Sequence, residues 1–384
     1  MSEYGVLLIG GKRTHQETHG PIFSDHPRCR LVAVAGEPDE PVFRKGSGRE
    51  LADHLGVPYI ADMDEALARD DVDIVSSTPH VERRGHVVVR CLEAGKHVYL
   101  DKPLAGSLEA IDAIVKAAAK ADVKTHMFSQ NHAPWVQAAR RVVDEGAVGD
   151  IVAVHAENIF AKGKAGSVLP GTVRREKEAV ERFTYVGAKR EMFDVAVYSL
   201  AWVHMLTGRR VESVFALTGN YFFADHAAVD VEDFGAMALR LEGGVTATAI
   251  GGRFGWSSHP GSGPQRVVIV GTEGTLSAEA GRRRVEVYNA EPDFTPPEVD
   301  PLDPMGMWLG RAPDYVAMSK QRRVSLERAL DTMAIDVAHF IDCIDNDRES
   351  ELNAAAAASL TETILAGYVS AARGEEAWLP LPRE

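Results

Sequence analysis

The sequence predicts an α/β plus α+β fold: an N-terminal doubly wound parallel sheet, followed by a C-terminal domain built on a mainly antiparallel open sheet. Three observations support this. The chain has 384 residues, which is long for a single hydrophobic core. Its first third alternates short β-branched runs with amphipathic helical patterns, and from about residue 150 longer alternating strands take over. We place the domain boundary after residue 128, giving domains of 1–128 and 129–384.

Five short apolar runs in the first domain are typical of parallel strands. The segments between them have helix signals: residues 80–95 close on Gly95, a helix C-cap, and residues 107–122 open on Ser107, a possible N-cap. Right-handed crossovers then produce the doubly wound arrangement. The five runs cover residues 6–10, 31–36, 73–78, 97–101 and 125–129.

Longer runs in the second domain alternate apolar and polar residues, which indicates strands with one buried face. Two helical segments, 326–345 and 353–373, close the chain, and we expect the last helix to pack back on the first domain. The alternating runs cover residues 151–160, 211–223, 235–252 and 265–280.

The composition argues against several classes of partner. The net charge of −14 provides no general basic surface to displace counterions, so neither nucleic acid nor an anionic membrane is expected. Cys29, Cys91 and Cys343 are too far apart for a metal or disulfide pattern. The N-terminus enters an apolar strand without a basic region or cleavage site, and no apolar run reaches membrane-spanning length. We therefore predict a cytoplasmic protein.

The turn after the first strand, residues 10–21, lies where a dinucleotide-binding Rossmann domain carries GxGxxG. Gly10 and Gly11 are retained, but Lys12 or Arg13 stands in place of the second glycine. Two interpretations remain open. The segment is either a surface turn or a phosphate site in which basic side chains replace some backbone contacts.

Two further strand ends favour a dinucleotide. Glu37 follows the second strand, where an acidic side chain accepts hydrogen bonds from a ribose 2′-hydroxyl and repels a 2′-phosphate. This favours NAD, although the nearby Arg44 and Lys45 would reverse the preference if they reach the cofactor, so NADP stays possible. Thr78 and Pro79 make a tight exit from the third strand, suited to passing beneath a nicotinamide ribose.

Three motifs, taken in order, resemble the Gfo/Idh/MocA family of oxidoreductases, which includes glucose–fructose oxidoreductase and inositol dehydrogenase. They are TP (78–79), EAGKHVYLDKP (93–103) and DVAVYSLAWVHMLTG (194–208). The second motif matches the family's AGKHVxxEKP except that Asp101 replaces glutamate. The third keeps the family's aspartate as Asp194 but has Ala196 and Tyr198 where DxGxH has glycine and histidine. The resemblance implies a Rossmann domain, a lysine (Lys102) beside the nicotinamide and Asp194 at the substrate.

Oxidation of a secondary alcohol needs a hydride acceptor, a base and a positive charge near the developing alkoxide. Asp194 and Tyr198 are spaced i, i+4, on one face of a helix. A tyrosine titrates near ~10 unless positive charge lowers its pKa, and Lys102 and the oxidised nicotinamide would provide that charge. We predict Tyr198 as proton acceptor, Lys102 as electrostatic partner and substrate orienter, and Asp194 as a hydrogen-bonding orienter or relay. The alternative is a solvated lysine, a helix N-terminal aspartate and a core tyrosine.

Further side chains suggest how a substrate would be held. Lys189 and Arg190, just ahead of Asp194, could clamp an acidic group or several sugar hydroxyls, or could be rim charges. His132 follows the last parallel strand, where the resembled family lines its sugar pocket. Three further residues lie in loops that could reach the same cleft, although residues of this kind are more often structural or exposed. They are Lys162, Lys164 and Trp256.

No metal site is predicted, because His15, His19 and His26 lack a clear carboxylate set. The residues predict an NAD(P)-dependent oxidoreductase of carbohydrate metabolism, a sugar dehydrogenase that oxidises a secondary alcohol or hemiacetal carbon of a sugar, glycoside or cyclitol by hydride transfer. Two alternatives stay open: a redox-assisted lyase or glycosidase, and a non-catalytic dinucleotide-binding regulator. The broad second sheet predicts a homodimer or homotetramer, since an exposed apolar face needs a cover.

Overall fold

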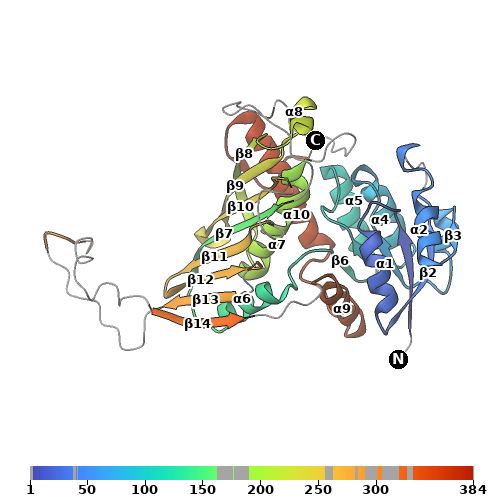
Figure 1. Cartoon of the computed structure of the whole chain (residues 1–384), viewed down its shortest axis with the longest axis horizontal. Coiled ribbons are helices and arrows are strands. Elements are labelled where there is room, and N and C mark those ends of the chain that lie inside the picture. Colours follow the sequence, from blue (N-terminus) through green and yellow to red (C-terminus); the bar gives the residue numbers. More distant parts are fainter. Residues whose placement is uncertain are drawn as a thin grey trace.

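Two sheets organise the chain, one in each half, with helices packed between and around them (Figure 1). The computed structural model describes residues 3–37, 40, 42–161, 176, 190–255, 263–281, 284–289, 301–304, 320–326 and 332–383. Within this part of the chain, no helix is long and apolar enough to cross a membrane.

The first sheet is parallel throughout and has the strand order β3-β2-β1-β4-β5-β6. The order reverses between β1 and β4, so a ligand site is expected at the carboxyl ends of these strands. All five predicted strands are present. The sixth, β3, has only two residues and carries too little pattern to be found in the sequence. The strands are β1 Tyr4–Ile9, β2 Cys29–Ala35, β3 Tyr59–Ile60, β4 Ile74–Ser77, β5 His97–Leu100 and β6 Thr125–Met127.

Helices connect these strands, and two of their ends follow the predicted signals. The Ser107 hydroxyl accepts a hydrogen bond from the Ala110 amide at 3.2 Å, which confirms the predicted N-cap. Gly95 adopts a left-handed backbone (φ 69°) just beyond the end of its helix, as glycine often does there. The helices are α1 Gln16–Asp25, α2 Ser47–Leu55, α3 Met63–Leu67, α4 Arg84–Glu93 and α5 Leu108–Ala118, with short 3₁₀ turns at Val42–Arg44 and Val81–Arg83.

The second sheet is mainly antiparallel, as predicted, with the order β14-β13-β12-β11-β7-β10-β9-β8-β15 and a parallel β7–β10 pair. Each of the predicted runs 235–252 and 265–280 is a pair of strands: the turn at Glu242–Gly244 divides the first run, and Thr272 and Glu273 divide the second. The strands are β7 Ile151–Phe160, β8 Val211–Gly219, β9 Phe234–Leu241, β10 Thr246–Arg253, β11 Gln265–Gly271, β12 Gly274–Glu279, β13 Arg284–Asn289, β14 Lys320–Leu326 and β15 Ala377–Trp378.

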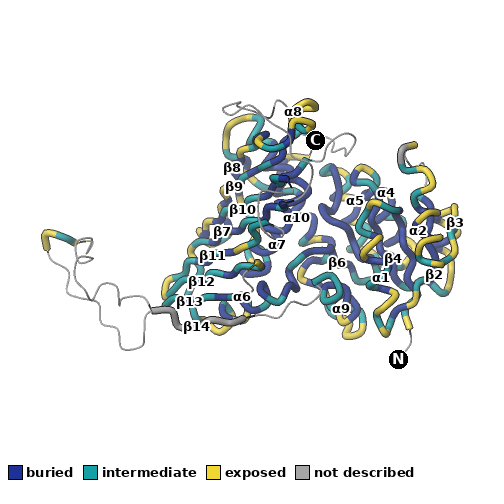
Figure 2. The backbone as a smooth tube through the Cα atoms, viewed as in Figure 1, coloured by how far each residue is buried: buried dark blue, intermediate teal, exposed yellow. Residues whose placement is uncertain are grey.

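Helix α7 lies close against this sheet and is buried along most of its length (Figure 2). Two glycines permit the approach. A Cβ on Gly251 would come within 2.3 Å of the Ala196 amide nitrogen, and one on Gly235 within 2.4 Å of the Met192 sulfur. The helices of this half are α6 Pro134–Asp144, α7 Glu191–Thr207, α8 Ala224–Ala228, α9 Thr332–Asp345 and α10 Ala354–Arg373.

The end of the chain returns to the first sheet. Helix α10 contacts α5, and α9 contacts α1. The Thr361 hydroxyl accepts a hydrogen bond from the Leu104 amide at 3.1 Å. The Leu352 carbonyl accepts one from the Met127 amide at 2.8 Å, next to edge strand β6. The last segment therefore completes the packing of the first domain.

Candidate active site

Lys102, Asp194 and Tyr198 meet in the structure, although 92 positions separate the lysine from the aspartate. Lys102 follows β5 and is 3% exposed. Its Nζ lies 2.6 Å from the Asp194 carbonyl oxygen and 3.0 Å from Oδ1, and 4.9 Å from the centre of the Tyr198 ring. The buried ammonium is thus paired with a carboxylate and lies over an aromatic face.

Arg253, at the end of β10, holds the other side of Asp194. Its guanidinium donates to Asp194 Oδ2 at 2.8 Å and also to Glu191, one turn earlier on α7. Burial favours the neutral form of Arg253, but the charges of Glu191 and Asp194 outweigh it and raise its pKa above the usual value. Asp194 therefore has a cation at each carboxylate oxygen.

Tyr198 is enclosed by aromatic rings, with Phe128 and Phe160 edge-on at 6.1 and 6.0 Å. Burial, and then the negative charges of Asp194 and Asp101, raise its pKa well above the usual value. Among the described residues, none hydrogen-bonds to the Tyr198 hydroxyl. In the protein alone this hydroxyl is protonated at neutral pH, so Lys102 by itself does not make Tyr198 a base.

Asp101 ties together the loops around Lys102. Its carboxylate accepts hydrogen bonds from Arg84 Nη2 at 2.5 Å and from the Lys102 amide at 2.8 Å, and it lies 2.7 Å from His15 Nδ1. Burial would raise the pKa of Asp101, but the charges of Arg84 and His15 overcome this and lower it. The anion joins the loop after β1, the start of α4 and the end of β5.

The predicted dinucleotide loop lies beside this group. Gly10 has φ 122°, and a Cβ there would come within 2.5 Å of Thr78 Oγ1. Arg13 has the left-handed φ of 61°, a conformation that glycine adopts most readily. Thr78 donates to the Thr14 hydroxyl at 3.0 Å, and Thr14 donates to the Gly11 carbonyl at 2.6 Å. The carboxyl ends of β1 and β4 are thus joined at the point where strand order reverses.

Glu37 provides a test of whether a dinucleotide fits. Its side chain is buried beside Arg83, with Oε2 3.4 Å from Arg83 Nε. Neither of these buried atoms has a hydrogen-bond partner within the described residues. Burial raises the pKa of Glu37. A ribose hydroxyl can donate to the carboxylate and accept from the guanidinium, so both atoms fit this cofactor.

Comparison with known protein families agrees with this architecture. Residues 4–129 match the family described as "Oxidoreductase family, NAD-binding Rossmann fold", and residues 136–277 match the "GFO/IDH/MocA C-terminal domain". The chain belongs to the GFO/IDH/MocA oxidoreductase family. The predicted family and the predicted NAD-binding Rossmann class are confirmed.

Relatives in the GFO/IDH/MocA family have several activities. The 2,7-anhydro-N-acetylneuraminate hydratase of Escherichia coli (strain K12) is 26% identical over 242 residues, covering 62% of this chain and 60% of that protein, less than two thirds of its length. The myo-inositol 2-dehydrogenase of Thermotoga maritima is 24% identical over 248 residues, covering 63% and 67%. The fold resembles that of levoglucosan dehydrogenase in complex with NADH and levoglucosan, with a TM-score of 0.73, 18% identity and coverage of 99% and 100%.

The remaining predicted site residues lie elsewhere or are not described. The Arg190 guanidinium pairs with Glu176 at 2.8 Å and Glu232 at 3.2 Å. His132 stacks on His339 with 3.7 Å between ring centres, and burial lowers its pKa to about 4. Pro79 accepts a hydrogen bond from Arg84, Lys12 is half-buried and Arg13 is exposed. The residues outside the described part of the chain are Lys162, Lys164, Lys189 and Trp256.

Sequence reasoning missed His15, Arg84 and Arg253. Arg253 belongs to no motif of this GFO/IDH/MocA chain, and its signal is only a charged residue that ends a strand of small side chains, TATAIGGR. The sequence presents His15 only as one of three histidines without a carboxylate set for a metal. Arg84 looked like one more charge on an amphipathic helix, although it is 5% exposed.

Proposed function

We propose that the protein is an NAD(P)-dependent dehydrogenase that oxidises a secondary alcohol or hemiacetal carbon of a sugar, glycoside or cyclitol. The pairing of Lys102 with Asp194 beside Tyr198, at the carboxyl end of β5, carries this proposal. Residues 1–128 would bind the dinucleotide and residues 129–384 the substrate. The myo-inositol dehydrogenase relative supports this substrate class.

The dinucleotide would lie along the carboxyl ends of β1, β2 and β4. Gly10, Gly11 and the neighbouring Lys12 and Arg13 would face its phosphates, and Thr78 and Pro79 its nicotinamide ribose. Glu37 would hold the adenosine ribose, which favours NAD over NADP because a buried carboxylate repels a 2′-phosphate. When bound, the oxidised nicotinamide supplies the hydride acceptor and a positive charge.

The chain's own residues would handle the proton and the developing charge. Tyr198 would present its hydroxyl to the substrate; under the added positive charge its proton would pass to solvent as the ligands bind, and the resulting phenolate would accept the proton of the substrate hydroxyl. Lys102 stabilises the negative charge that develops on the substrate oxygen as the carbonyl group forms. Asp194 fixes the ammonium, and Arg253 fixes Asp194. In the reverse direction, the raised pKa keeps Tyr198 protonated, so that its hydroxyl has a proton to donate.

Initial rates of nicotinamide reduction over a panel of sugars, glycosides and cyclitols test this function. We expect Lys102→Met, which keeps the apolar stem, to lower kcat/KM about 100- to 1,000-fold, with NADH still bound. Lys96→Met, just before β5, is the matched control and should retain activity. A Lys102→Met protein that oxidises the sugar at the wild-type rate would remove the assignment.

A second candidate function is a redox-assisted lyase or glycosidase, in which the cofactor is reduced only transiently. The hydratase relative favours it. The two functions differ in stoichiometry. A dehydrogenase releases one reduced nicotinamide for each substrate consumed, whereas the lyase releases product without net reduction. Measuring the absorbance of the reduced nicotinamide and the amount of product in the same reaction distinguishes the two functions.

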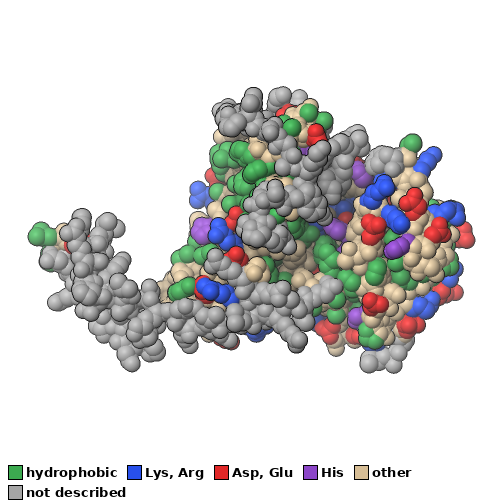
Figure 3. Space-filling model, viewed as in Figure 1, with side chains coloured by type: hydrophobic (Ala, Val, Ile, Leu, Met, Phe, Trp, Pro, Cys, Tyr) green, Lys and Arg blue, Asp and Glu red, His purple; other side chains and the backbone are tan. Residues whose placement is uncertain are grey.

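The open face of the second sheet supports assembly into a homodimer or homotetramer. Hydrophobic side chains gather over β8 and β9 (Figure 3). Exposed apolar residues on the sheet include Val152, Phe215 and Leu217, which a second copy would cover. Analytical ultracentrifugation of Leu217→Asp tests this.

We further propose a cytoplasmic location, which suits the three free, buried cysteines.

A further inference from the structure

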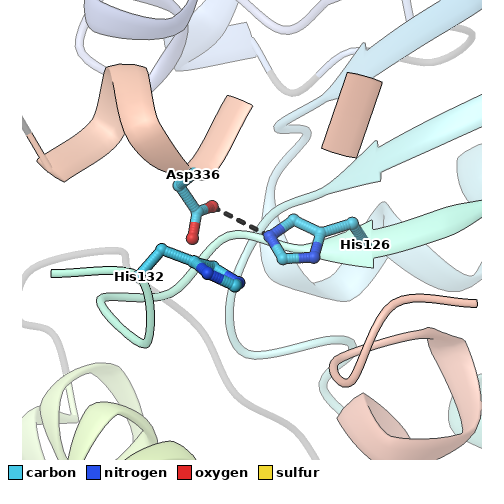
Figure 4. Close-up of side chains that lie close together, drawn as sticks. All are labelled: His126, His132 and Asp336. Atoms are coloured by element: carbon cyan, nitrogen blue, oxygen red, sulfur yellow. Dashed lines mark hydrogen bonds and ion pairs between the residues drawn. The ribbon is translucent and has the colours of Figure 1, made fainter. Parts of the chain in front are cut away.

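A second group of buried polar side chains lies beyond β6, apart from Lys102. His126 is on β6, His132 is in the following loop and Asp336 is on α9. One nitrogen or oxygen from each lies within 4.8 Å of the others, and all three residues are buried. Figure 4 shows their polar ends turned toward a common point. Three segments that are distant in sequence therefore present possible ligand atoms to the same small volume.

Two members of this group have polar atoms without a hydrogen-bond partner among the described residues. Asp336 Oδ2 accepts from the Tyr99 hydroxyl at 2.6 Å and lies 2.9 Å from His126 Nε2. Asp336 Oδ1 is buried and has no hydrogen-bond partner in the described part of the chain. The His132 ring likewise makes no hydrogen bond to any described residue. A fully buried carboxylate oxygen without a hydrogen-bond partner is costly unless a ligand compensates for it.

Surrounding residues already orient the group as a metal site requires. The Ser350 hydroxyl lies 2.6 Å from His126 Nδ1 and so leaves Nε2 directed at Asp336. The Tyr99 hydroxyl fixes the carboxylate. Metal-binding histidines and carboxylates are held by such hydrogen bonds from a second layer of residues.

We propose that His126, His132 and Asp336 bind a Zn²⁺ ion, with the remaining coordination position left to water. Two imidazoles and one carboxylate suit Zn²⁺ better than Mg²⁺ or Ca²⁺, which take oxygen ligands. Tetrahedral bonds to Zn²⁺ place ligand atoms roughly 3.3 Å apart. His126 and Asp336 would separate slightly, and His132 would move inward. This departs from the sequence prediction of no metal site.

The ion would tie α9 to the edge of the first sheet. Its three ligands come from β6, the loop that follows and α9, whereas Lys102 follows β5 and Asp194 lies on α7, so the proposed role is structural. Binding to the folded state alone should raise Tm as Zn²⁺ is added.

Zinc binding can be measured directly on the full chain. Protein stripped with EDTA and dialysed is titrated with ZnCl₂ against a chromophoric chelator, and the bound metal is counted by elemental analysis after gel filtration. We expect one Zn²⁺ per chain. Asp336→Asn and His132→Gln should each weaken binding at least about 100-fold, and Tyr99→Phe about 10- to 100-fold. The Zn²⁺-dependent rise in Tm should disappear in the first two variants.

Matched controls separate this site from adventitious surface binding. Asp342→Asn changes an exposed carboxylate on the same helix, and His86→Gln an exposed histidine on α4; both should bind Zn²⁺ as the wild type does. Co²⁺ should give a visible absorption band in the wild type and not in His132→Gln. Equal zinc uptake by wild type and His132→Gln, or equal losses in the controls, would overturn the proposal. His132→Gln removes no hydrogen bond seen in the described structure, so it remains informative if Asp336→Asn fails to fold.

Discussion

Two buried aspartates, Asp194 and Asp336, are satisfied in different ways. Asp194 has Lys102 at one carboxylate oxygen and Arg253 at the other. Asp336 has both its partners on Oδ2, and its Oδ1 is unpartnered within the described residues. Cations of the chain thus hold both oxygens of Asp194, whereas one oxygen of Asp336 takes both of its hydrogen bonds. The unpartnered Oδ1 of Asp336 is the atom at which the proposed Zn²⁺ is expected.

The hydroxyl of Tyr198 gives the largest expected effect. Tyr198→Phe keeps the ring between Phe128 and Phe160 and removes only a hydroxyl that no described residue hydrogen-bonds. We expect kcat to fall about 100- to 10,000-fold, with the urea midpoint of unfolding unchanged. Full activity would show that the proton takes another route, and a large loss of stability would show that the hydroxyl has a structural partner.

Replacing Asp194 should affect stability as well as rate. Asp194→Asn leaves Lys102 and Arg253 buried with less compensating charge, and we expect a loss of about 3–5 kcal/mol in the free energy of unfolding. Glu191→Gln, which also removes a partner of Arg253, is the matched comparison. It should destabilise the protein while reducing kcat much less, because the Glu191 carboxylate pairs with Arg253, whereas that of Asp194 also pairs with Lys102. Equal loss of kcat in both would assign the rate effect to Arg253.

Glu37 extends the comparison, since its Oε2 also lacks a hydrogen-bond partner among the described residues, although it lies 3.4 Å from Arg83 Nε. Glu37→Gln should raise KM for NAD about 10-fold or more, because a hydrogen bond to a charged group contributes about 1.5–3 kcal/mol. The preference for NAD over NADP should fall with it, as measured by kcat/KM for each. Glu40→Gln nearby should change neither constant. An unchanged preference would mean that Glu37 does not face the ribose.

Glu232 shows a third arrangement, in which pairing does not keep the acid ionised. Burial outweighs the charge of Arg190 and raises the pKa of Glu232 to about 7. The folded state then binds more protons than the unfolded state between about pH 4.3, the usual value, and pH 7. The free energy of unfolding should decrease modestly as pH rises through this window and level off above it. In urea titrations, the free energy of unfolding of Glu232→Gln should lack this decrease between about pH 4.3 and pH 7. A pH profile identical to that of the wild type would contradict the assignment of the decrease to Glu232.

Much of the fold was predictable because its signals are local. Parallel strands buried on both faces appear as short β-branched runs, and the Ser107 cap and the i, i+4 spacing of Asp194 and Tyr198 are each contained within one segment. Lys102 could be linked to Asp194 only through a family resemblance. Arg253 and Asp336 could not be found, because their importance arises from contacts between segments that carry no common pattern.

Strand boundaries were least predictable where glycine decides them. The run 235–252 contains two strands because Gly243 and Gly244 take left-handed conformations between them. The first of the two closing helices is predicted over residues 326–345, but Leu326 ends β14 and α9 covers Thr332–Asp345. A continuous apolar pattern does not indicate where the chain turns.

The bond from Met127 to the Leu352 carbonyl has a consequence for biosynthesis. The edge of the first sheet is covered by residues that leave the ribosome more than two hundred positions later. Until then the nascent first domain displays an unpaired strand edge, the kind of surface at which chains associate with one another. A gene fragment that stops at the domain boundary should therefore yield aggregate-prone protein, and co-expression of the missing C-terminal helices as a separate peptide should improve its recovery.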